Sequence, residues 1–203
     1  MNVLSRIVLG SASPRRLELL RSLNFEVRVV PSDYDEPAHP GVAPHDLAIL
    51  HARHKAYDVR ARERRDVVVA ADTVVDVEGT AYGKPRDPAE AMQMLRNLSG
   101  RTHLVHTAFA LALPERDDMI EACESTRVTF FGLTNDEIAD YVASGEPFDK
   151  AGAYGIQGSA ATLVQRIDGD FYTVMGFPVA RFVRTLRRLG FTPPASNQNV
   201  TIS

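Results

Sequence analysis

The run Val67-Val68-Val69-Ala70-Ala71-Asp72-Thr73-Val74-Val75, which continues to Val77, decides the fold of this 203-residue chain. β-Branched residues dominate the run, and a nearly continuous apolar stretch of this length is typical of a strand buried on both faces. Glu78-Gly79 follows directly and predicts a turn into a hairpin. We therefore expect a central strand over 67–77.

Asp72 interrupts this strand, and a carboxylate buried there without a partner would be strongly destabilising. The residue must therefore lie at a strand end, in a cleft or beside a cation. Two interpretations carry equal weight at this point. The carboxylate binds a divalent metal and orients or deprotonates a water, or it is a structural aspartate held by a neighbouring arginine.

A second candidate site lies towards the N-terminus, where Ile7-Val8-Leu9 predicts a short buried strand. Ser13-Pro14 supplies an N-cap and a first residue for a helix that follows almost at once. The N-terminus of that helix, the hydroxyl of Ser11 and the guanidinium groups of Arg15 and Arg16 together favour an anion such as phosphate. A capped surface helix with two solvated arginines explains the same residues equally well.

Two lysines are candidates for contact with an anionic ligand. Lys55 lies beside the small apolar stripe of a helix predicted over 44–62, where a lysine that only extends to solvent is the commoner case. Lys84 follows the hairpin on a Gly-Lys-Pro turn, and it gains a role only if the hairpin folds back towards Asp72.

The stretch from Ser144 to Gly158 contains four glycines, a density typical of tight turns or of close approach between backbone and ligand. Within it, the amide of Gln157 has both a donor and an acceptor and is suited to the edge of a nucleobase. A purely structural loop with an internal Asp149–Lys150 pair is an equal alternative.

The remaining pattern predicts an α/β fold with a mixed central sheet flanked by helices. Further strands are expected over 25–30, 103–113, 121–130 and 161–167, and helices over 87–100, 134–145 and 178–189. We expect one domain over 1–191, followed by a flexible tail over 192–203.

Composition limits the classes of function. The formal net charge is −3, which disfavours a nonspecific nucleic-acid-binding surface. Cys123 is the only cysteine and no apolar run approaches the roughly 20 residues of a membrane helix, so we expect a cytoplasmic protein without a membrane anchor. The sequence contains no HExxH element, no Walker A element and no GxGxxG element, which disfavours the common zinc protease, ATPase and dehydrogenase classes.

Taken together, these segments resemble the Maf family of septum-formation-inhibitor-like nucleoside triphosphate pyrophosphatases. The resemblance covers most of the chain in order, through SASPRR at 11–16, SDYDE at 32–36, Lys55-Ala56, ADTVV at 71–75, GKP at 83–85, LSGxxHxVxT at 98–107 and SGEPxDKAGAYGIQG at 144–158. The last motif resembles the branch that acts on dTTP and UTP. The resemblance implies a mixed α/β fold with two lobes around a cleft, and commonly a homodimer.

The resemblance also implies a role for each candidate residue. Asp72 would be the proton acceptor, and Glu36 and Asp72 would be the ligands of a divalent cation, Mg²⁺ or Mn²⁺. The residues that contact phosphates would be Ser11, Arg16, Lys55 and Lys84. Those that select the nucleotide would be Arg15, Thr73 and Gln157.

The function expected from this resemblance is hydrolysis of dTTP and UTP, or of modified pyrimidine nucleotides, to the monophosphate and pyrophosphate. Two alternatives remain open at this point. One is a nucleotide-binding regulator of septum formation that does not turn its ligand over. The other is a house-cleaning pyrophosphatase for purine nucleotides of the ITP or XTP type.

Overall fold

A computed structural model describes residues 2–37, 39–114 and 116–195. Its centre is a seven-stranded sheet in the order β3-β2-β4-β6-β7-β8, with β5 paired to the end of β4. The strands are β2 (Arg6–Leu9), β3 (Glu26–Val29), β4 (Val68–Val77), β5 (Thr80–Tyr82), β6 (Thr102–Ala112), β7 (Ile120–Phe130) and β8 (Val164–Asp168). β2 runs parallel to β3 and to β4, whereas the other pairs are antiparallel. The predicted mixed sheet is therefore confirmed.

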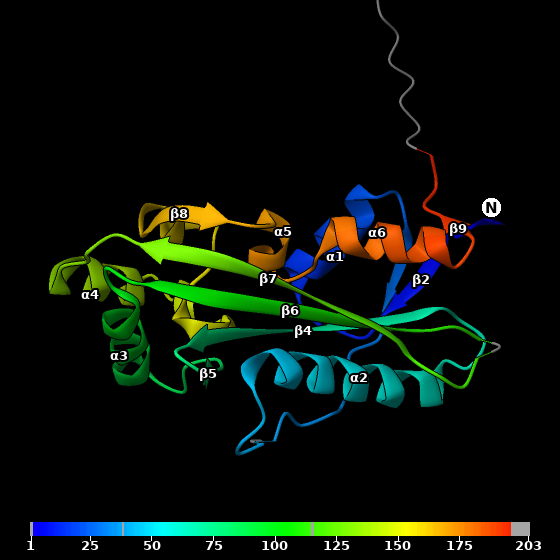
Figure 1. Cartoon of the computed structure of the whole chain (residues 1–203), viewed down its shortest axis with the longest axis horizontal. Helices are drawn as coiled ribbons and strands as arrows, with labels where there is room; N and C mark the ends of the chain where they lie inside the picture. Colours follow the sequence, from blue (N-terminus) through cyan, green and yellow to red (C-terminus); the bar gives the residue numbers. More distant parts are fainter. Residues whose placement is uncertain (1, 38, 115, 196–203) are drawn as a thin grey trace, which may run out of the picture.

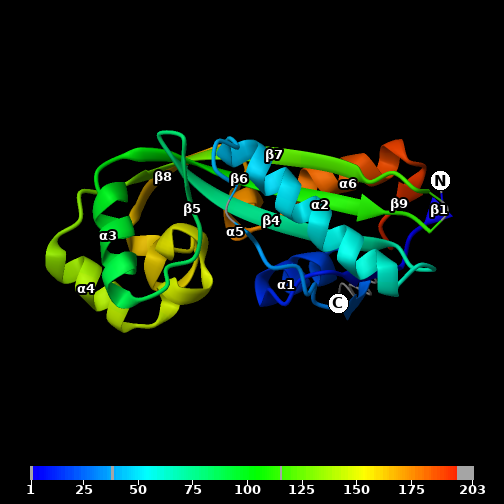
Figure 2. The ribbon, with the colours of Figure 1, turned by 90° about the horizontal axis from the view of Figure 1, so that it is seen from below.

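One long helix, α2 (Pro44–Arg62), covers one face of the sheet along β4 and β6 (Figures 1 and 2). Ala48, Ala52 and Ala56 recur every four residues on its buried side and pack against Ala70 of β4 and Ala108 and Ala110 of β6. Small side chains on both surfaces let the helix approach the sheet closely, so a long side chain on its flank can reach the edge of β4.

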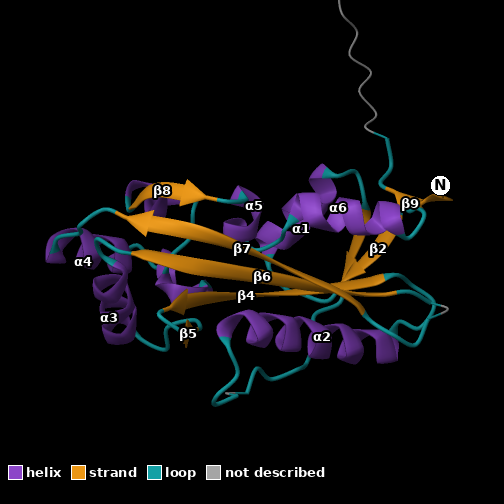
Figure 3. Ribbon diagram, in the orientation of Figure 1, coloured by secondary structure: helices purple, strands orange, loops and turns teal. Residues whose placement is uncertain are grey.

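Two further groups of helices lie at the two ends of the long strands (Figures 1 and 3). At one end, α1 (Pro14–Ser22) and α6 (Val179–Arg188) enclose a core around Phe109, Phe177 and Phe182. At the other end, α3 (Pro88–Leu98), α4 (Asn135–Ala143) and three short 3₁₀ turns over 146–162 enclose a second core around Phe130 and Tyr154. The molecule thus has two lobes built on one continuous sheet.

A gap in strand pairing separates the lobes. β2 pairs with β4 only at Val68 and Val69, and β5 joins the same edge only from Val75 onward. Among the described residues, positions 70–74 have no strand partner on this edge, although β6 pairs with their other edge throughout. Side chains from both faces of β4 can reach an opening here.

Most predicted elements are present with ends shifted by one or two residues, and three differences are larger. Residues 158–162 form a 3₁₀ turn, so the strand expected from residue 161 begins at Val164. A short helix, α5 (Phe171–Met175), was not predicted, because five residues carry too little periodicity to stand out. Thr192, the expected first residue of the tail, pairs with Val3 through β9 (Phe191–Thr192) and β1 (Asn2–Val3), whereas 196–203 lie outside the described residues.

Within the described ranges, every helix is too short or too polar to cross a membrane.

Candidate active site

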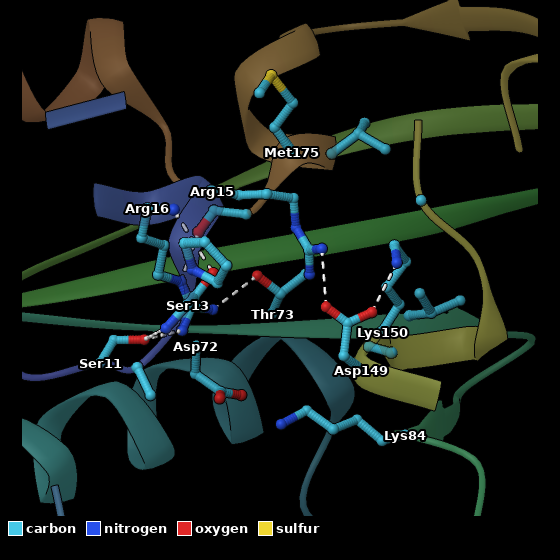
Figure 4. A pocket seen from close by; sticks show the side chains of 18 of the residues that line it. Ser11, Ser13, Arg15, Arg16, Asp72, Thr73, Lys84, Asp149, Lys150 and Met175 are labelled. Atoms are coloured by element: carbon cyan, nitrogen blue, oxygen red, sulfur yellow. Dashed lines mark hydrogen bonds and ion pairs between the residues drawn. The ribbon is translucent and has the colours of Figure 1, made fainter. Parts of the chain in front are cut away.

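A cleft of about 670 Å³ opens at the unpaired stretch of β4, within the usual size range of small-molecule sites. It brings together every residue that the sequence singled out as a site candidate: Ser11, Arg15, Arg16, Glu36, Lys55, Asp72, Thr73, Lys84 and Gln157. These residues come from six separate segments of the chain. Figure 4 shows Asp72 and Thr73 projecting to opposite sides of β4, so polar side chains line the cleft from both sides of the same strand.

The turn between β2 and α1 forms one wall of the cleft. A Cβ atom at Gly10 would lie 3.1 Å from the side chain of Val59 and 3.2 Å from that of Ala70, so a glycine allows the turn to press against α2 and β4. Ser13 caps α1 by accepting a hydrogen bond from the backbone N–H of Arg16. The predicted cap is confirmed, and it fixes the direction in which Arg15 and Arg16 leave the helix.

Arg16 is tied to three parts of the structure. Its Nε donates to the backbone oxygen of Gly176 at 2.9 Å, Nη1 to Ser11 Oγ at 3.0 Å and Nη2 to Thr73 Oγ1 at 3.2 Å. Burial lowers the pKa of this guanidinium, although the nearby charges of Asp72 and Glu36 oppose the shift. A guanidinium has five N–H donors, so two remain for a ligand.

Thr73 is held equally firmly. Its Oγ1 lies 3.0 Å from Thr107 Oγ1, and the hydroxyl of Thr107 donates to the backbone oxygen of Thr173 at 2.7 Å. Since the Thr107 proton is committed to Thr173, Thr73 donates to Thr107 and accepts from Arg16. Thr107 and Thr173 are fully buried, so this chain joins β4, β6 and α5 beneath the cleft.

On the other side of β4, Lys55 of α2 lies between two carboxylates. Its Nζ lies 2.6 Å from Asp72 Oδ1 and 2.5 Å from Glu36 Oε1. Lys55 and Asp72 are buried, whereas Glu36 is more exposed. Asp72 faces α2 because side chains alternate along a strand and Ala70 and Val74 on the same face also pack against that helix.

Burial and charge act in opposite directions on these two acids. Burial raises the pKa of Asp72 above its usual value, although the Lys55 ammonium opposes the shift. Burial also acts to raise the pKa of Glu36, but the charge and hydrogen bond of Lys55, together with the charge of Lys84, bring it below its usual value. Of the two acids, Asp72 is therefore the better proton acceptor. A lysine, and not the arginine considered from the sequence, is its direct ionic partner.

The donor set can be tested against the divalent cation implied by the family. Glu36 and Asp72 direct two carboxylates at one point, while the described residues include no cluster of three or more acidic, histidine or cysteine side chains arranged for a metal. Mg²⁺ typically takes one or two carboxylates and completes its shell with water and substrate phosphates. The two carboxylates fit an ion of that kind, and they do not form a closed protein cage.

Across the cleft, Asp149 links the glycine-rich stretch to α1. Its Oδ2 accepts from Arg15 Nη1 at 3.0 Å, and its Oδ1 accepts from Lys150 Nζ at 2.6 Å (Figure 4). The Asp149–Lys150 pair suggested by the sequence is present, but its contact with Arg15 was not predicted. A Cβ atom at Gly155 would lie 2.9 Å from the Lys150 side chain, so a glycine leaves room for this lysine.

Lys84 and Gln157 line the cleft without a fixed partner among the described residues. Lys84 is exposed and its side chain extends towards Asp72 (Figure 4), so the hairpin does fold back as the sequence required. The Gln157 side chain is exposed and makes no hydrogen bond to another described residue. Both side chains are therefore available to a ligand.

Other cleft residues were not proposed from the sequence. Tyr34 places its hydroxyl 3.2 Å from His51 Nδ1 beside Glu36, and Tyr154 is buried with its hydroxyl 2.6 Å from His103 Nε2. Isolated tyrosines and histidines carry no spacing signal. The family motifs over 32–36, 98–107 and 144–158 contain Tyr34, His103 and Tyr154, and this was the only available indication.

Comparison with known proteins gives a consistent result. The sequence model of the family described as "Maf-like protein" matches residues 6–189. A protein of Geobacter sulfurreducens named dTTP/UTP pyrophosphatase is 50% identical over 185 residues, covering 91% of this chain and 97% of that protein. Proteins with the same name from Geotalea uraniireducens and Carboxydothermus hydrogenoformans are 47% and 46% identical, covering 94% and 92% of this chain and 98% and 100% of their own lengths.

Proposed function

The chain belongs to the Maf family, and we propose that it hydrolyses dTTP and UTP to the nucleoside monophosphate and pyrophosphate. One observation supports this above the others. Five cationic side chains and four carboxylates line a single cleft in a protein whose net charge is −3; the cations are Arg15, Arg16, Lys55, Lys84 and Lys150, and the carboxylates are Glu36, Asp72, Glu146 and Asp149. The cleft therefore has an excess of positive charge in an acidic protein, which suits a triphosphate.

In the proposed reaction, a water attacks the α-phosphorus and the bond from that phosphorus to the bridging oxygen of the β-phosphate breaks. Asp72 accepts a proton from the water, and pyrophosphate leaves. Before nucleotide binds, Oδ1 of Asp72 is bound to Lys55, whereas Oδ2 makes no hydrogen bond within the described residues and can take the proton. The raised pKa of this carboxyl brings its basicity closer to that required near neutral pH.

The cations stabilise the charge that develops on the phosphates. Within the described part of the chain, Arg16 keeps two free N–H donors, and Ser11 fixes its orientation, so the guanidinium would meet a phosphate without reorganising. Lys55 and Lys84 would approach the triphosphate from the other side of β4. A divalent cation held by Glu36 and Asp72 would neutralise phosphate charge and make its bound water more acidic.

Three side chains at the opposite end of the cleft would select the nucleotide. Arg15 and Gln157 offer hydrogen-bonding groups at the cleft surface, and Thr73 lines the same cleft with its hydroxyl bound to Arg16 and Thr107. A donor held in place by another residue, as Arg15 is by Asp149, discriminates strongly, because a wrong base leaves it unpaired.

A pyrophosphate-release assay over a panel of nucleotides tests the proposal. We expect turnover of dTTP and UTP, with slower turnover of CTP, GTP, ITP and XTP. Faster turnover of ITP or XTP would favour the purine alternative. Binding of dTTP without pyrophosphate release, in the presence of Mg²⁺ or Mn²⁺, would favour a regulator of septum formation. A homodimer stays a prediction of the family resemblance, and a cytoplasmic location stays a prediction of the composition; light scattering of the purified protein tests the dimer.

A further inference from the structure

The Lys55 ammonium occupies the point at which two carboxylates of the cleft converge. Its distances of 2.5 Å to Glu36 Oε1 and 2.6 Å to Asp72 Oδ1 show that the same positive charge holds both. Only 11% of the Lys55 side chain is exposed, so the ammonium has exchanged most of its hydration for these two oxygens.

A divalent cation held by Glu36 and Asp72 requires the same two oxygens. Mg²⁺ binds carboxylate oxygens at about 2.0–2.1 Å, and the O–N distances here differ from that value by only a few tenths of an ångström. The metal and the ammonium therefore cannot occupy this point together, and their mutual repulsion at such a separation is large in a poorly hydrated site.

The Lys55 side chain can move away from the two carboxylates. Its backbone is fixed, because α2 is packed on the sheet through Ala52 and Ala56 on either side of it. Its four-carbon side chain is flexible, however, and lines the open cleft. An incoming anion would give the ammonium a new partner without any movement of the helix.

We propose that Lys55 is a built-in competitor of the divalent cation, which holds the two carboxylates together until metal and triphosphate arrive. The lysine then exchanges Glu36 and Asp72 for phosphate oxygens. Its removal therefore strengthens metal binding to the nucleotide-free protein. This inference rests on the proposed metal-dependent reaction, but its test requires no turnover.

The test measures Mn²⁺ binding to the full chain without nucleotide, by titration calorimetry and by the loss of the free-ion EPR signal. We expect Lys55→Met to bind Mn²⁺ about tenfold more tightly than wild type, a change of about 1.4 kcal/mol. The double variant Lys55→Met with Glu36→Gln should lose the gain, because one of the two carboxylates is then replaced by a neutral amide. Equal or weaker binding by Lys55→Met would overturn the inference and leave the pyrophosphatase assay unaffected.

Lys150→Met is the matched control, because Lys150 also contacts an aspartate at 2.6 Å in the same cleft but does not touch Glu36 or Asp72. Its Mn²⁺ affinity should equal that of wild type, and a gain like that of Lys55→Met would overturn the inference. If Lys55→Met does not fold, Lys55→Gln retains a donor for Asp72 Oδ1 and should show the same gain. Should both variants unfold, recovery of the folded protein on adding Mn²⁺ supports the inference, and absence of recovery contradicts it.

Discussion

Asp72 and Asp149 lie in the same cleft, and each accepts a hydrogen bond from a lysine Nζ at 2.6 Å. The pKa of Asp72 is nevertheless raised, whereas that of Asp149 is lowered. The side chain of Asp72 is 8% exposed and that of Asp149 is 57% exposed. For Asp72, the effect of burial exceeds that of Lys55, whereas for Asp149 burial is outweighed by the hydrogen bond of Lys150 and the charge and hydrogen bond of Arg15.

Contact geometry alone therefore does not assign a role to an ion pair. The two lysine–aspartate distances are equal, yet the pKa of Asp72 is shifted towards the range of a useful general base and that of Asp149 is shifted away from it. The buried wall of the cleft is therefore suited to proton transfer, and the exposed wall is suited to holding side chains in position.

Turnover should separate the two aspartates most strongly. We expect Asp72→Asn to lower kcat for dTTP about 1000-fold, because the proton acceptor is lost, while nucleotide affinity stays within a few-fold of wild type. Asp149→Asn makes the same chemical change on the exposed wall and should lower kcat less than about tenfold. Pyrophosphate release and equilibrium binding measure both. Wild-type turnover by Asp72→Asn would show that another group accepts the proton.

Removal of Lys55 and removal of Lys150 should lower the free energy of unfolding by different amounts. Lys55→Met leaves Asp72 buried without its cation, and we expect it to lower the free energy of unfolding by about 3 kcal/mol. Lys150→Met leaves a carboxylate that water already reaches, so the loss should stay below about 1 kcal/mol. Urea unfolding at neutral pH without divalent metal measures both. Similar losses for the two variants would show that burial does not decide the energetics here.

The pH dependence of stability should have opposite signs for the two aspartates. Because the folded pKa of Asp72 is raised, the contribution of this carboxyl is fully present below its usual value of 3.8 and is lost as pH rises through the folded pKa. The folded pKa of Asp149 is lowered, so its contribution is present above 3.8 and is lost as pH falls through the folded value.

Urea unfolding across acidic pH gives the measurement. Relative to wild type, Asp72→Asn should gain stability as pH rises above 3.8, and Asp149→Asn should gain stability as pH falls below it. Trends of the same sign in the two variants would contradict the assigned directions.

The smallest expected effect is on nucleotide selection. Arg15→Lys keeps the charge but removes the planar guanidinium, and we expect it to reduce the ratio of kcat/KM for dTTP over dCTP by about tenfold or less. Asp149→Asn should move the ratio in the same direction, since it only frees Arg15. Arg28→Lys, at an ion pair with Glu63 and Asp66 outside the cleft, is the matched control and should leave the ratio unchanged. An unchanged ratio in Arg15→Lys would remove this residue from the selecting set.

Local signals in the sequence were sufficient for most of the elements. The cap at Ser13 was predicted and is present, and Asp87 and the capping box of Thr134 with Glu137 begin two of the predicted helices; each cap joins groups only three residues apart. The central strand over 67–77 was also predicted, since its apolar run needs no partner to be recognised. The boundary of β8 and the existence of α5 were missed, because packing and not periodicity sets them.

The sequence by itself also determined that Asp72 could not be buried alone and had to lie at a strand end, in a cleft or beside a cation, since the cost of a lone buried carboxylate does not depend on the fold. Only the tertiary structure decided which cation it received, because Lys55 reaches it from the face of β4 covered by α2. The partners of Arg16 lie 57 and 160 residues along the chain, and Arg15 meets Asp149 over 134 residues. Contacts over such separations leave no local pattern, because they arise only when the sheet brings distant segments to one unpaired strand edge.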